Sequence, residues 1–225
     1  EYLKLIIEHR EYEIALQRID ELIEYHSNSK NKKLEIWLLK VKCLRELIKR
    51  DEMGIELKKI EKIINYFKLS ELYLNYLYQY EEFLFLSNDF TAAFRIINKG
   101  LKLSRELNNI KLETMFQFLL TRNLNTTGKV NECLKEAEKL LKLSEYVGSA
   151  KHHYWANYFI AINLQTLQHY VDSNKIIDKY IEKAKEETDI FFLGIFNAAK
   201  AKYYFKINEY SKFIDLTREQ YKIDL

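Results

Sequence analysis

The chain has 225 residues and a formal net charge of +3, because 36 basic residues are nearly balanced by 33 acidic ones. This balance excludes the strongly basic composition typical of nucleic-acid-binding domains. A content of 48% hydrophobic and 14% aromatic residues excludes an intrinsically disordered chain. With no proline and only 5 glycines, we expect long uninterrupted helices.

A period of about 40 residues runs along the whole chain. Its marker positions, four of them small residues, are separated by 39, 39, 40, 40 and 40 residues: Ala15, Gly54, Ala93, Cys133, Ser173 and Phe213. A fixed period of this length indicates one supersecondary unit stacked repeatedly on itself.

Apolar residues recur at helical spacing in two segments of each period. In chain order, the predicted helices are 11–26, 33–49, 51–66, 70–87, 89–107, 110–125, 129–146, 150–167, 169–187, 189–206 and 209–223. Polar runs such as Asn108-Asn109 separate them. Asp89 and Asn208 are expected to cap the helices that follow them.

Two helices of a pair can cross closely where each carries a small residue. Twelve residues before the marker positions, this requirement is met by Ala161 and Ala201 and tolerated by Thr121. The same position holds Lys42 and Glu81, whose charged side chains must either leave the interface or find a partner there.

The helix pairs, with small residues twelve apart (Ala161 with Ser173) and an aromatic residue before the second helix (Tyr170, Tyr210), resemble tetratricopeptide repeats, TPRs. The longer unit, with linkers such as 104–109, is similar to the helical repeats of Gram-positive peptide-pheromone receptors, the PlcR, PrgX, Rgg, NprR and Rap group. The predicted fold class is all-α, a right-handed superhelix of stacked antiparallel helix pairs (a TPR-like α-solenoid). We expect 1–225 to form a single domain of about six units, ending in a capping helix.

The resemblance to pheromone receptors implies a function. It implies a peptide-binding regulatory domain of a cytoplasmic quorum-sensing transcription regulator, which binds a short signalling peptide in its concave groove. It also implies a preceding helix-turn-helix domain, contact with DNA only through that domain, and a homodimer. The alternatives are a protein–protein interaction scaffold and the sensory repeat region of another signalling protein.

In such a superhelix the first helix of each pair lines the concave side. We therefore expect a groove lined by these candidate peptide-binding residues: Asn75, Tyr78, Gln79, Glu82, Phe118, Arg122, Asn125, Tyr158, Ile162, Gln165 and Lys202. Their amides could bind an extended peptide backbone, and Arg122 or Lys202 could hold a carboxylate. If the register differs by two residues, the binding amides are instead a ladder of Gln117, Asn157 and Asn197.

No catalytic or metal-binding motif is evident, so we predict neither an enzyme nor a cofactor. His152 and His153 are adjacent and point in different directions from a helix, unlike an i, i+4 metal-binding pair. Cys43 and Cys133 lie 90 residues apart, and two unpaired cysteines are typical of a reducing cytoplasm. No stretch approaches the length of apolar sequence that spans a membrane.

Overall fold

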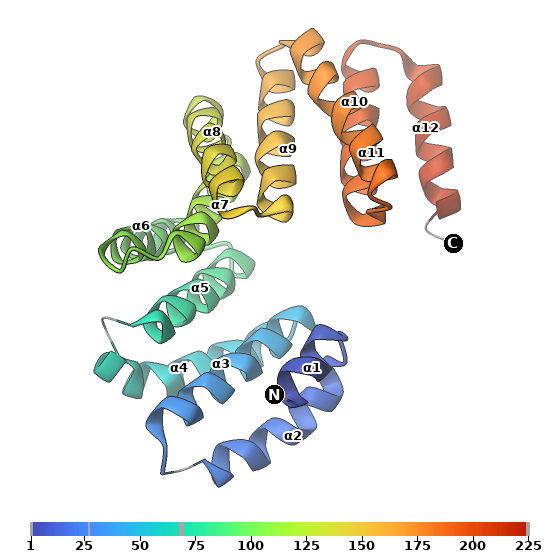
Figure 1. The fold of residues 1–225 in the computed structure, drawn as a ribbon. Helices are drawn as coiled ribbons and strands as arrows, with labels where there is room; N and C mark the ends of the chain where they lie inside the picture. The colour runs from blue at the N-terminus through green and yellow to red at the C-terminus, as the bar shows by residue number, and fades with distance from the viewer. Residues whose placement is uncertain (1, 27, 68–69, 224–225) are drawn as a thin grey trace. The chain divides into compact units, whose positions relative to one another are not determined.

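The computed structural model describes residues 2–26, 28–67 and 70–223 (Figure 1), and helices are the only regular elements in these ranges. They are α1 (Tyr2–Glu8), α2 (Tyr12–Tyr25), α3 (Lys30–Glu46), α4 (Arg50–Ile64), α5 (Glu71–Leu86), α6 (Phe90–Glu106), α7 (Ile110–Thr126), α8 (Val130–Val147), α9 (Ala150–Thr166), α10 (Tyr170–Glu186), α11 (Ile190–Lys206) and α12 (Tyr210–Ile223), with a short 3₁₀ helix η1 (Asn65–Phe67) after α4. The predicted helices are confirmed, with ends displaced by three residues at most. The sequence analysis missed α1 and η1.

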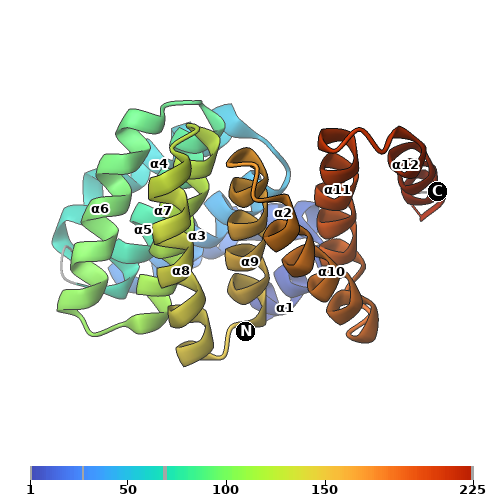
Figure 2. The ribbon, with the colours of Figure 1, turned by 90° about the horizontal axis from the view of Figure 1, so that it is seen from above.

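The chain divides into two compact units, Glu1–Phe116 and Gln117–Leu225, which we call the first and second unit. In the first unit, consecutive helices α1 to α6 pack against one another, and α3 also contacts α5. In the second unit, consecutive helices from α8 to α12 pack in the same way, and α9 also contacts α11. Figure 2 shows α11 and α12 as a hairpin joined by a short turn. Contacts between alternate helices are what stacked helix pairs require.

The turns between helices share one backbone conformation. Residues with positive φ recur at 20-residue intervals: Asn88, Asn108, Gly128, Gly148, Gln168, Thr188 and Asn208. The amide after each of them donates to a carbonyl five residues earlier, as Lys129 N does to Leu124 O over 2.9 Å. This is the helix-ending Schellman hydrogen bond. The 40-residue period is thus two similar helix-turn units.

Helix starts follow the predicted capping at one position and not at the other. Asp89 caps α6, because its Oδ1 accepts from Ala92 N over 3.0 Å. The prediction for Asn208 is wrong: it precedes Glu209, the residue before α12, and adopts a left-handed conformation with φ 62°. Its Oδ1 instead accepts a hydrogen bond from the Tyr210 hydroxyl over 2.7 Å.

The marker residues of the period are packing positions. Ala15, Ala93, Cys133 and Ser173 are all fully buried on second helices. At the crossing position, Ala161 is fully buried, as expected, and Glu81 is too, so its carboxylate does not leave the interface.

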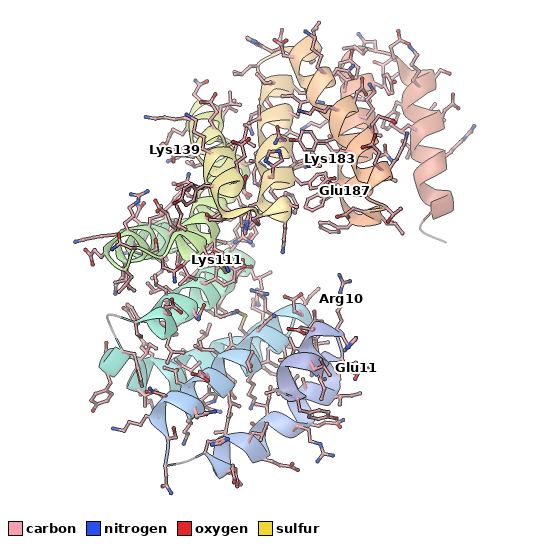
Figure 3. All side chains as sticks on the ribbon, in the orientation of Figure 1. Arg10, Glu11, Lys111, Lys139, Lys183 and Glu187 are labelled. Carbon is pink, nitrogen blue, oxygen red and sulfur yellow. The ribbon has the colours of Figure 1, made fainter. Side chains whose placement is uncertain are left out.

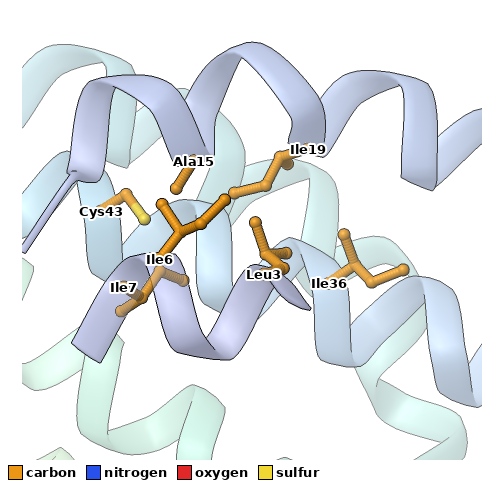
Figure 4. Close-up of a cluster of buried hydrophobic side chains, with 7 residues drawn as sticks. All are labelled: Leu3, Ile6, Ile7, Ala15, Ile19, Ile36 and Cys43. Atoms are coloured by element: carbon orange, nitrogen blue, oxygen red, sulfur yellow. The ribbon is translucent and has the colours of Figure 1, made fainter. Parts of the chain in front are cut away.

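The core of the first unit begins with the helix that sequence analysis missed. Leu3, Ile6 and Ile7 of α1 pack into a cluster of buried hydrophobic side chains drawn in Figure 4, whose other members are Ala15, Ile19, Ile36 and Cys43. The short α1 therefore covers the apolar faces of α2 and α3, as the first helix of a pair should.

Candidate functional site

Three first helices of the second unit each contribute one ring to a continuous aromatic row. Phe118 of α7 and Trp155 of α9 have ring centroids 5.8 Å apart, and Trp155 and Phe191 of α11 are 6.2 Å apart. We call these three residues the aromatic row. Phe191 is 61% exposed, and the other two rings are half-buried. The row therefore crosses three helices and presents ring surface to the solvent.

A buried aromatic layer lies beneath the row and holds it in place. Phe159 is buried and stacks on Trp155, with centroids 5.7 Å apart and planes 23° apart. Phe192 is also buried and meets Trp155 edge-on at 5.7 Å. The predicted site residue Tyr158 lies beside Trp155, at 5.6 Å, and remains partly exposed. Rings packed in this way lose little further side-chain entropy when they bind a ligand.

Polar groups at the edge of the row are mostly basic or neutral. The Arg122 guanidinium lies over the Phe118 ring, 5.7 Å from its centroid, in cation–π geometry. Burial, and then the charge of Lys151, lower the pKa of His152 to about 4, so this imidazole is neutral at pH 7. Its Nδ1 lies 2.8 Å from the Ser149 hydroxyl. Lys202 is exposed on α11.

Of three other candidate residues in the second unit, two connect first helices to one another. Gln165 is buried, and its Nε2 donates to Ala199 O over 3.0 Å, linking α9 to α11. Asn125 accepts from Asn163 Nδ2 over 3.0 Å, linking α7 to α9. Ile162 is buried on α9. The amides of Gln165 and Asn125 thus make hydrogen bonds within the fold, and the Ile162 side chain packs inside it.

Two residues of the alternative amide ladder also make hydrogen bonds within the second unit. Gln117 Nε2 donates to the Glu136 backbone oxygen over 3.1 Å and to its carboxylate over 2.8 Å, which joins α7 to its partner α8. Asn157 Nδ2 donates to His153 O over 2.9 Å. Asn197 is partly buried on α11.

In the first unit, three candidate residues of α5 gather around a cation that the sequence analysis missed. Arg45 of α3 donates to Gln79 Oε1 over 3.4 Å and lies over the Tyr78 ring at 5.6 Å. Burial alone would lower the pKa of Arg45, but Tyr78, Glu82 and the neighbouring Glu46 together outweigh burial and raise this pKa. Asn75, by contrast, is exposed on α5. No spacing rule links Arg45 to residues more than thirty positions later, so no sequence signal identified it.

The side chains with metal-binding or nucleophilic chemistry do not assemble into a site in the described parts of the chain. No group of three or more His, Cys, Asp or Glu residues there could hold a metal ion. Burial raises the pKa of Cys43 to about 11 and that of Cys133 to about 12, so both remain thiols at neutral pH. Among the same residues, no helix combines the length and apolar character needed to cross a bilayer.

Comparison with known proteins supports the fold. No protein-family model and no curated protein sequence matches the chain. Among solved structures, a crystal structure of nearly identical TPR-like repeats from a Podosopora anserina kinesin light chain superposes with a TM-score of 0.63 at 9% sequence identity. The match covers 84% of this chain and 94% of that one. The predicted fold class, a TPR-like α-solenoid of stacked helix pairs, is therefore confirmed.

Proposed function

We propose that the chain is a protein-interaction module whose second unit binds an extended polypeptide segment across the aromatic row. A binding role fits the fold, because stacked helix pairs present a repeated surface formed by their first helices. The observation that carries the proposal is the contact of Phe118, Trp155 and Phe191 across three such helices.

The chemistry of the row suits noncovalent recognition of apolar side chains. Aromatic residues and arginine are enriched at the centres of protein interfaces, and both occur here. Tyr158 adds a hydroxyl beside Trp155, and burial raises its pKa, so it remains a neutral hydrogen-bonding group. The underlying Phe159 keeps the surface ordered before binding, which lowers the entropic cost of association.

A narrower form of the proposal follows from the resemblance to pheromone receptors. In this form the ligand is a short signalling peptide, and the chain belongs to a cytoplasmic, homodimeric regulator of transcription that contacts DNA through another domain. The long helical unit and the aromatic surface support it. Sedimentation of the protein with and without bound peptide tests the dimer, and peptide-dependent DNA binding by the whole protein tests the regulator.

Selection from a displayed library of random linear peptides tests the general proposal. Peptides selected on the second unit's surface should lose about tenfold or more in affinity with Phe191→Ala or Tyr158→Ala, as expected for partly exposed aromatic anchors. Tyr146→Ala is the matched control, because Tyr146 is 77% exposed but lies on the second helix α8. Retained binding by the first two variants, or an equal loss in the control, would refute binding at the row.

A further inference from the structure

Acidic residues are absent from the first-helix segments of the second unit. Residues 117–126, 150–166 and 190–206 contain no Asp or Glu, whereas their cations are Arg122, Lys151, Lys200, Lys202 and Lys206. The second helices of the same unit hold carboxylates: Glu132, Glu136, Glu138 and Glu145 on α8, Asp172, Asp178, Glu182 and Glu186 on α10, and Asp215 and Glu219 on α12. In the described part of this unit, acidic residues are thus confined to the second helices and the turns, whereas lysines occur on both kinds of helix.

Two exposed lysines share the helix faces that carry the aromatic row. Lys151 precedes Trp155 by four residues and Tyr158 by seven, so helical periodicity places the three side chains on one face of α9. Lys202 follows Phe191 by eleven residues, or three turns, on one face of α11. Lys200 is different, because its Nζ bonds to Asp178 over 2.6 Å and to Asn174 over 2.5 Å on α10.

Several carboxylates elsewhere in the second unit are engaged by lysines or backbone groups close to them. On α8, Lys139 pairs with Glu136 over 2.7 Å. Two more carboxylates lie in the turn just before α11. Glu187, labelled with Lys183 in Figure 3, accepts from the Tyr154 hydroxyl over 2.7 Å and pairs with Lys183 over 3.7 Å. Asp189 caps α11 by accepting from Phe192 N over 3.0 Å. Because α9 and α11 contain no Asp or Glu, the positive charges of Lys151 and Lys202 are not compensated by their own helices.

We infer that the polypeptide bound at the aromatic row is acidic, with aromatic or aliphatic side chains alternating with Asp or Glu. This inference rests on the proposed function and adds the chemical class of the partner. The rings would bind apolar side chains, while Lys151 and Lys202 attract carboxylates from the flanking helix faces. Charge complementarity of this kind accelerates association and excludes basic partners.

An acidic peptide fits this surface better than a single-stranded nucleic acid does. Nucleic-acid grooves combine closely spaced cations with ring faces open for base stacking. Here the exposed lysines lie on separate helices, and the Trp155 ring stacks on Phe159 instead of presenting both faces to solvent.

The test uses three pools of linear peptides about ten residues long, enough in extended form to cross helices spaced about 10 Å apart. The apolar positions are randomised identically, and the polar positions hold only Glu, only Gln or only Lys. We expect the Glu pool to bind roughly tenfold more tightly than the Gln pool at low salt, with the Lys pool weakest. The difference should shrink in high salt because the lysines are exposed.

Matched lysine variants test whether the acidic peptides bind at the surface that carries Lys151 and Lys202. The double variant Lys151→Gln/Lys202→Gln should reduce the preference for Glu peptides to about threefold or less, consistent with the loss of two exposed charges. The control Lys142→Gln/Lys175→Gln removes the same charge from exposed positions on α8 and α10 and should leave the preference unchanged.

The possible outcomes separate the two proposals. Equal binding of the Glu and Gln pools would overturn the acidic ligand and leave peptide binding intact. Failure of all three pools would overturn both. Tighter binding of oligodeoxythymidylate than of the Glu pool would replace the peptide with a nucleic acid.

Discussion

Gly100 of α6 lies directly against the ring of Phe116 of α7. A methyl group on the Gly100 Cα would lie 2.2 Å from Phe116 Cε1 and 2.4 Å from two further ring atoms. Phe116 is fully buried, so its ring cannot move aside without displacing the surrounding core. The two helices approach this closely because position 100 has no side chain.

This contact predicts that Gly100→Ala destabilises the protein. Alanine favours a helix over glycine by about 1 kcal/mol, but overpacking against a fixed ring costs about 1–3 kcal/mol. Gly194→Ala is the control, because Gly194 lies within α11 and nothing would lie within 4 Å of its methyl group. Urea unfolding followed by circular dichroism should show a loss for the first variant and a gain for the second. A gain in both would contradict the packing.

A second prediction concerns the turn between α3 and α4. Ile48 is 77% exposed and has a φ of 58°, a left-handed conformation in which β-branched side chains are strained. Ile48→Gly should raise the free energy of unfolding by about 1 kcal/mol, because the relief of strain exceeds glycine's entropic cost.

The exposed isoleucine Ile55, within α4, provides the comparison for Ile48. Ile55→Gly should lower the free energy of unfolding, by up to about 1 kcal/mol, since glycine is unfavourable inside a helix. If both substitutions destabilise the protein to the same extent, position 48 is not strained.

The helices were predictable because their determinants are local. Apolar spacing, turn residues and the absence of proline located them to within three residues. The missed α1 has only seven residues and is stabilised by packing against α2 and α3, which its own sequence does not reveal.

The sequence predicted which helices carry the candidate site, but it did not predict the contacts of the individual side chains. Phe118 and Tyr158, two residues of the predicted groove, are partly exposed in the structure. Helical periodicity could not show that Gln165 bonds to Ala199 or that Arg45 meets Gln79, because these contacts depend on how separate helix pairs stack. Phe191, the most exposed ring of the row, was missed because it lies only one residue inside α11.

A third prediction tests the close crossing of α9 with its partner α10. Ala161 is fully buried at this crossing, so Ala161→Leu should cost about 1–3 kcal/mol by overpacking. Ala150→Leu, at the exposed first residue of α9, provides the control and should change stability little. The difference between their thermal midpoints measures the effect, and equal midpoints would show that α9 crosses elsewhere.

A fourth prediction follows from His152, whose folded-state pKa of about 4 lies below its ordinary value of 6.5. The unfolded chain takes up a proton at His152 as the pH falls through 6.5, but the folded protein does not until about pH 4. Stability associated with the neutral imidazole is therefore present above pH 6.5 and lost towards pH 4, by about 1–2 kcal/mol at pH 5.

Urea unfolding at neutral pH and near pH 5 measures this loss. The variant His152→Gln cannot take up the proton, so its stability should decline less between the two conditions. An identical decline in both proteins would show that His152 is not shielded from protonation.

The most direct test uses the two tryptophans, because Trp155 lies in the aromatic row and Trp37 lies in the first unit, where it donates to Glu56 over 2.8 Å. In the Trp37→Phe protein, titration with a selected peptide should produce a saturable change in Trp155 emission with the affinity measured by calorimetry. A peptide that binds without altering Trp155, yet alters Trp37 in the Trp155→Phe protein, would contradict binding at the aromatic row.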